Sequence, residues 1–90
     1  MDSHQRVWNA IDALATSAGL TPSGLAKAAG LDPTTFNRSK RIDARGRQHW
    51  PNAETIQKAL DASGRTWSEF GHLVEAGPNA LQREEGTDLT

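Results

Sequence analysis

The segment that decides the fold is GLTPSGLAKAAGLDPTTFNR, residues 19–38. Thr21 is a good helix N-cap, and Pro22 then takes the first helical position, where a missing N–H costs nothing. Gly30 ends this short helix, because glycine accepts the positive φ that a tight turn needs. Asp32 and Pro33 then begin a new helix. The segment therefore predicts two short helices joined by a tight turn, the second running from about residue 33 to residue 40.

Two short helices joined in this way are the helix-turn-helix arrangement. We expect Leu25, Leu31 and Phe36 to hold the second helix against the rest of the domain. The polar residues on its outer face are of types that read base edges in DNA: arginine pairs with guanine, asparagine pairs with adenine, and the threonine methyl packs on the thymine methyl. These candidate base-reading residues are Thr34, Thr35, Asn37 and Arg38.

A basic segment overlaps the end of this helix and continues beyond it. Between residues 37 and 50, five cations stand against one acid, Asp43; they are Arg38, Lys40, Arg41, Arg45 and Arg47, and His49 lies beside them. The formal net charge of the whole chain is only −1, which argues against a general polyanion binder and makes the positive charge a local signal. A loop is expected over residues 41–51. Trp50 is expected in the core with its edge near a phosphate, in preference to stacking on a base.

Three further helices complete an all-α prediction. Residues 4–18 have one apolar stripe at helical spacing, and Ser3 is expected to cap that helix. Asn52 is expected to cap a helix that ends near residue 62. Thr66 and Glu69 have the spacing of a capping box, which predicts the start of the last helix.

The residues quoted above resemble the helix-turn-helix of the lambda-repressor-like (Cro/C1, or XRE) family, with its Gly-Leu-Thr entry, Leu-Ala in the first helix and Ala-Gly-Leu at the turn. A narrower similarity is to the N-terminal DNA-binding domain of alphaproteobacterial phage-repressor-like or LexA-like regulators of the S24 peptidase group. It rests on residues 36–41, Gly46-Arg47 and Trp50-Pro51. The resemblance implies an all-α, five-helix lambda-repressor-like DNA-binding domain of a transcriptional regulator, of repressor type. The helix over residues 33–40 would lie in the major groove.

The resemblance also implies roles for single residues. Thr34 and Arg38 would read bases, and Thr35 and Asn37 would contact either a base or a phosphate. Phosphate contacts are expected from Lys40, Arg41, Arg45, Arg47 and His49, and from the helix N-termini at Thr21 and Asn52. Two departures stand out. First, the family often has Gln where this chain has Pro22. Second, the family often pairs an Arg of its first helix with a Glu just past the recognition helix, which is the helix that lies in the major groove. Those two places align with Ala15 and Lys40 in this chain.

Several function classes are excluded or disfavoured by the composition. The chain has no cysteine, which removes disulfides, thiol catalysis and cysteine-ligated metals. His4, His49 and His72 are too scattered for a metal site, and no serine has a base arrangement around it, so neither enzymatic activity, nor a cofactor, nor a small-molecule substrate is expected. No apolar run approaches the roughly 18 residues of a membrane span. We expect a cytoplasmic protein that associates with the bacterial nucleoid through DNA.

We expect a DNA-binding domain over residues 1–76 and a flexible polar tail or start of a linker over residues 77–90. Ten large apolar residues, Trp67 among them, are assigned to the core, which leaves Leu73, Val74 and Leu81 for contact between copies. So small a surface predicts a free monomer and two copies side by side on a near-palindromic operator. Two alternatives stay open: a complete small regulator, and an antitoxin-like helix-turn-helix module that mainly binds a partner protein.

Overall fold

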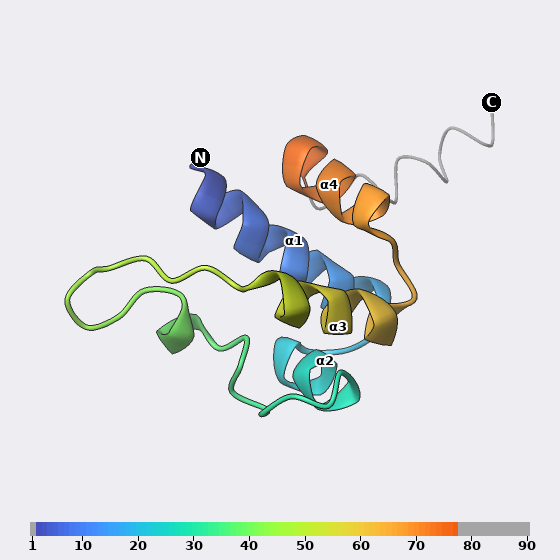
Figure 1. Cartoon of the computed structure of the whole chain (residues 1–90), viewed down its shortest axis with the longest axis horizontal. Helices are drawn as coiled ribbons and strands as arrows, with labels where there is room; N and C mark the ends of the chain where they lie inside the picture. Colours follow the sequence, from blue (N-terminus) through green and yellow to red (C-terminus); the bar gives the residue numbers. More distant parts are fainter. Residues whose placement is uncertain (1, 78–90) are drawn as a thin grey trace.

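The computed structural model describes residues 2–77, which form a small all-α domain. Four α-helices and one short 3-10 helix follow each other along the chain: α1 (Ser3–Ser17), α2 (Pro22–Ala28), η1 (Arg38–Lys40), α3 (Ala53–Ser63) and α4 (Trp67–Ala76). Figure 1 shows α4 and α2 on opposite sides of the molecule, with α1 and α3 between them. No sheet occurs in the described part of the chain, and none of its helices has the length and apolar character to cross a membrane.

Side-chain caps explain where most helices begin. The side chains of Thr21 and Asn52 accept hydrogen bonds from Gly24 N and Thr55 N, as predicted. Thr66 and Glu69 form the predicted capping box at the start of α4. The expected cap of α1 is wrong by one residue: Asp2, not Ser3, accepts from Gln5 N at 2.8 Å. A carboxylate is the stronger acceptor here and also favours the positive end of the helix dipole.

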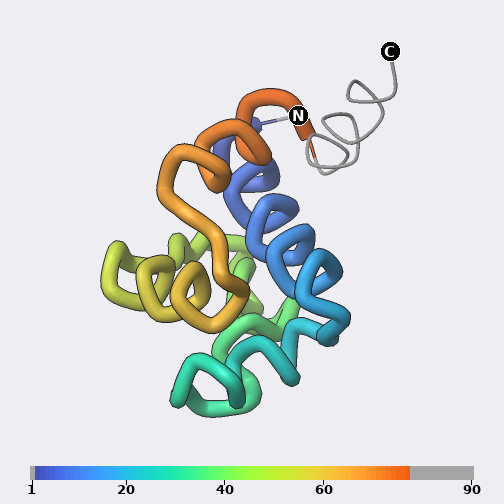
Figure 2. Tube along the Cα trace, turned by 90° about the vertical axis from the view of Figure 1, so that its right-hand side faces the viewer, coloured from blue at the N-terminus to red at the C-terminus, as the bar shows by residue number. Residues whose placement is uncertain are grey.

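The core is built around α1, which packs against the other three α-helices. Figure 2 shows the chain from a second side, with α4 near one end of α1 and α2 near the other. The largest fully buried side chains are Phe36, Ile11, Leu14, Leu25, Leu60 and Leu73. Phe36 and Leu25 are therefore the anchors that the sequence predicts for the helix-turn-helix region. Leu31 is only half-buried.

The predicted helix over residues 33–40 does not form as a continuous helix, so the five-helix layout is wrong in this respect. Two successive turns occur instead, with Thr35 N donating to Asp32 O and Asn37 N donating to Thr34 O, and η1 follows. The reason is local. The Asp32 carbonyl oxygen, which would accept from Phe36 N in a helix, instead accepts from both N and Oγ1 of Thr35 at 2.9 and 2.6 Å. Threonine and asparagine are also weak helix formers.

Other packing expectations also need correction. Trp67 and Trp50 were expected in the core, but they are 46% and 54% exposed. The Trp67 ring packs edge-on against Phe70, and its Nε1 donates to Gln57 Oε1 at 2.7 Å on the surface. Leu73 was expected to be left over for a second copy, but it is 1% exposed and belongs to the core. Of the expected tail, only Gly77 is described; Leu81 lies outside the described residues.

Residues 41–50, here called the basic arm, extend away from the helices (Figure 1, yellow-green). This segment is non-helical, as predicted, but its hairpin form was not predicted. Ile42 pairs with Gln48 in an isolated antiparallel bridge, and Asp43 N donates to Arg47 O at 3.0 Å. At the tip, Gly46 N donates to Asp43 O and Gly46 has a φ of 81°, which gives the hydrogen-bond pattern of a three-residue hairpin loop.

Candidate functional site

The base of the basic arm is attached to α1 by a buried histidine. His4 is 4% exposed, and its Nε2 lies 3.0 Å from the carbonyl oxygens of both Arg41 and His49. Two carbonyl acceptors require a proton on Nε2. The indole N–H of Trp8 therefore donates to His49 O, 2.9 Å away, rather than to the imidazole. The sequence predicted no role for His4, and the only local signal is that His4 and Trp8 lie one helical turn apart.

Arg41 is also attached to α1, although the sequence assigned it to a phosphate. It is 8% exposed, and its two terminal nitrogens donate to the two carboxylate oxygens of Asp12 at 2.9 and 2.6 Å. Its Nε and Nη2 also donate to Phe36 O, and its guanidinium lies 4.7 Å from the centre of a Trp8 ring. These contacts use the guanidinium inside the protein, which argues against a phosphate contact at Arg41.

The Asp12–Arg41 pair also bears on the family resemblance. The family often pairs an Arg of its first helix with a Glu just past the second helix of its helix-turn-helix, and this chain departs from that pattern. Here an ion pair joins α1 to the residue just past η1, but the acid is on the helix and the base is on the following segment. A comparable connection is thus made with the charges exchanged and at positions other than the aligned Ala15 and Lys40.

Asp43 organises the tip of the basic arm. Its Oδ1 accepts from the backbone N–H groups of Arg45 and Arg47 at 2.9 and 3.0 Å, and its Oδ2 lies 3.0 Å from Arg47 Nε and 3.1 Å from His49 Nε2. The backbone hydrogen bond from Arg47, followed by the side-chain bond from His49, lowers the pKa of Asp43 from 3.8 to about 2. The carboxylate thus stays ionised at neutral pH. Arg47 and His49 still have 69% and 53% of their side chains exposed.

The expected base-reading residues fall into two groups. The hydroxyls of Thr34 and Thr35 donate to Asp32 within the turn, each at 2.6 Å, so their donor hydrogens are used internally. Asn37 and Arg38 are exposed. Three cations of this region, Arg38, Lys40 and Arg45, have side chains that form no hydrogen bond or ion pair with the described residues, and the same holds for Arg6, Lys27 and Lys58 elsewhere in the domain.

The structure brings some of the predicted residues together. Thr21, Asn37 and Arg38 line one open depression of about 260 Å³, with Arg41 and Asp12 also among its lining residues. Asn52 is exposed at the start of α3, and it is not among the residues that line this depression. Thr21 and Asn52 each use a side-chain oxygen to cap their own helix.

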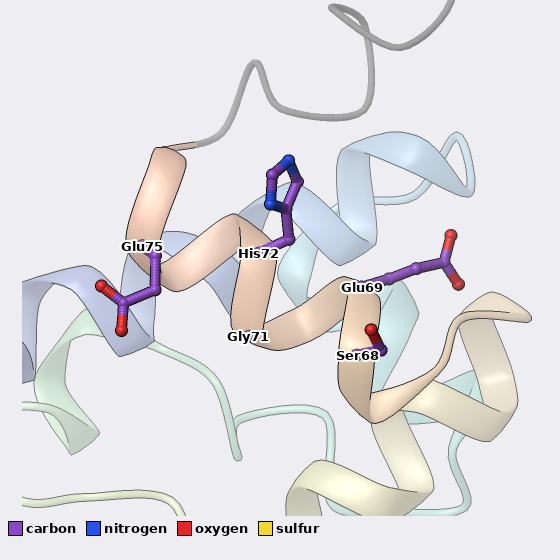
Figure 3. Close-up of a pocket in the computed structure, with 5 residues that line it drawn as sticks. All are labelled: Ser68, Glu69, Gly71, His72 and Glu75. Carbon is purple, nitrogen blue, oxygen red and sulfur yellow. The ribbon is translucent and has the colours of Figure 1, made fainter.

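A second hollow lies on α4 and is lined by Ser68, Glu69, Gly71, His72 and Glu75. Figure 3 shows that the side chains of Glu69, His72 and Glu75 point in different directions rather than toward a common centre. Among the described residues, no group of three histidine or acidic side chains has the arrangement of a metal site. This hollow offers no chemistry of its own.

Comparisons with family models, curated proteins and solved structures find no match for this chain. The candidate site therefore consists of two segments that follow each other in the sequence: the turn segment, residues 33–40, and the basic arm. Its exposed cations are Arg38, Lys40, Arg45 and Arg47. Its exposed large apolar residues are Ile42 and Trp50.

Proposed function

We propose that this chain is the sequence-specific, double-stranded-DNA-binding domain of a transcriptional regulator, of repressor type, in which α2 and the turn segment take the place of the two helices of a lambda-repressor-like helix-turn-helix. The observation that supports this most is the set of exposed cations on the turn segment and the basic arm, three of which form no salt bridge with the described residues. Unpaired cations on neighbouring segments bind a phosphate backbone well, because each contact releases counterions.

The turn segment is the proposed base reader in the major groove. Burial of Phe36 fixes the segment on the domain, and Arg38 is exposed with no hydrogen bond or ion pair from its side chain to the described residues. The methyl groups of Thr34 and Thr35 are left to contact thymine, because their hydroxyl hydrogens are engaged with Asp32. Arg38 therefore provides the main hydrogen bonds to base edges, with Asn37 beside it.

Two copies are proposed to bind a near-palindromic operator. One domain of this size reads only a few base pairs, so useful specificity requires a second domain on the same DNA. The burial of Leu73 removes one residue expected to be left for contact between free copies, whereas the exposed Ile42, Trp50 and Trp67 add apolar surface.

The test is selection from a random duplex-DNA library with the full chain, followed by affinity measurements on the enriched sequence at several salt concentrations. We expect an enriched motif with two-fold symmetry and an affinity that falls steeply with salt. Absence of any enriched motif, together with a salt-independent signal, would overturn the proposal.

A second candidate is an antitoxin-like module that binds a partner protein. The specific observation in its favour is the exposure of Ile42 and Trp50, at 49% and 54%, on the same arm as the cations. Aromatic residues are enriched in protein interfaces. A chain that enriches no DNA sequence would favour this candidate.

A further inference from the structure

The tip of the basic arm presents one long side chain. The loop consists of Ala44, Arg45 and Gly46, so Arg45 lies between a methyl group and a hydrogen. Arg45 is exposed, and its guanidinium forms no hydrogen bond or ion pair with the described part of the chain. The result is a slim tip with a single unpaired positive charge.

The backbone under this charge is held in place at both ends of the arm. Near the tip, the Asp43 carboxylate accepts the N–H groups of Arg45 and Arg47. At the base, His4 and Trp8 bind the carbonyl oxygens of Arg41 and His49. An arm ordered before binding loses less conformational entropy when it meets a ligand than a mobile loop does.

We propose that the basic arm enters the DNA minor groove beside the major-groove site of the turn segment, with Arg45 reading a narrow, A·T-rich stretch. This inference rests on the proposed function and deepens it by assigning Arg45 to the groove floor instead of a phosphate. The minor groove is about 6 Å wide, and its narrowing in A·T-rich DNA strengthens the negative potential that attracts an inserted arginine. A tip with one long side chain between two small residues suits so narrow a space.

The order of the chain agrees with this arrangement. The arm begins directly after Arg38 and Lys40, and Arg45 lies four residues beyond Arg41 in an extended strand and turn. At about 3.3 Å per residue a fully extended chain would reach about 13 Å, so the tip of the turn lies at most this far from Arg41, a distance comparable with the major-groove width of about 12 Å. Lys40 and Arg47, which precede and follow Arg45 in the sequence and are both exposed, are then left for the phosphates.

The experiment uses the full chain and the duplex enriched by selection, with the base pairs flanking each half-site replaced in four ways. A·T and inosine·C pairs lack the guanine amino group in the minor groove, whereas G·C and diaminopurine·T pairs have an amino group there. In the major groove the grouping is different, since inosine presents the same groups as guanine. We expect A·T and inosine·C flanks to bind about tenfold more tightly than the other two, and Arg45→Ala to abolish this preference.

Two controls separate the possible results. Lys58→Ala removes a cation from α3 and should keep the flank preference, and circular dichroism checks that each variant is folded. Two results would overturn this inference and leave the proposed function standing. In the first, the wild-type chain binds G·C and inosine·C flanks alike and A·T and diaminopurine·T flanks alike, which means that it distinguishes major-groove groups. In the second, the wild-type chain binds all four flanks equally. A wild-type chain that binds no duplex overturns the proposed function itself.

Discussion

Asp12 and Arg41 join two distant parts of the chain through a two-point ion pair, with nitrogen–oxygen distances of 2.9 and 2.6 Å. The pair lies between α1 and the start of the basic arm, and the Arg41 side chain is 10% exposed. A cation that the sequence assigned to DNA thus serves to hold the arm on the domain.

The first prediction concerns the stability of this pair. Asp12→Ala leaves the buried guanidinium without its partner, which should lower the free energy of unfolding by about 2 kcal/mol. Urea unfolding followed by circular dichroism measures the change. The control is Asp61→Ala, which removes an exposed carboxylate of α3 that bonds, among the described residues, to Gln57 alone. Equal effects of the two substitutions would contradict a structural role for the pair.

The second prediction concerns base reading by Arg38. Arg38→Ala should cost about 1–3 kcal/mol of binding free energy on the selected sequence and relax the preference at one position in each half-site. Competition binding against single-base variants of the selected duplex measures both effects. An equal loss of affinity for selected and random DNA would show that Arg38 contacts the backbone only.

The third prediction concerns phosphate contacts. Lys40→Ala and Arg47→Ala should each weaken binding to all sequences and lower the slope of log affinity against log salt by about 0.9. Arg41→Ala should behave differently, since it should destabilise the fold through loss of the Asp12 pair. Salt titrations and urea unfolding of the same three variants distinguish these effects. An unchanged slope of log affinity against log salt in a Lys40/Arg47 double variant would show that these two cations do not contact phosphates.

The fourth prediction concerns pH. The folded-state pKa of Asp43 is lowered to about 2 from an ordinary value of 3.8. Its contribution to holding the arm is therefore complete above about pH 4 and is lost as the pH falls toward 2. The amide resonances of Arg45 and Arg47 report this titration in NMR spectra, and Asp43→Asn should remove it. A midpoint near 4 would mean that the carboxylate does not make these bonds in solution.

The fifth prediction concerns assembly. The free chain should sediment as a monomer at micromolar concentration, and two copies should bind one palindromic duplex, where the DNA raises their effective concentration. Sedimentation with and without the duplex tests both statements. A tight dimer without DNA would identify an interface that involves other surfaces, such as the exposed Trp67.

The sequence predicts the α-helices well because their signals are local. The caps at Thr21, Asn52 and Thr66 each involve a bond to a residue three positions away. The segment after Asp32 has a helix start signal too, but the same carboxylate also stabilises a turn, and only Phe36 anchors the segment in the core. Local chemistry alone did not decide between these two outcomes.

The arm was harder to predict, because its contacts span the chain. The bonds from His4 to residues 41 and 49, and the pair between Asp12 and Arg41, depend on how α1 packs against the rest of the domain. Charge and composition indicated a basic loop correctly. They did not indicate which of the five cations between residues 37 and 50 is buried, because the burial of Arg41 depends on contacts with α1 and Phe36 that form only in the folded chain.

The bond between His4 and the two carbonyl oxygens has a consequence for protein engineering. In a chain without cysteine, one imidazole closes the loop of residues 41–49 in the way that a crosslink would. The tip lies beyond that closure, so residues 44 and 45 can be exchanged on an unchanged base, with Gly46 kept for its φ of 81°. Under the proposed function, such exchanges are a route to variants with altered DNA preferences on one scaffold.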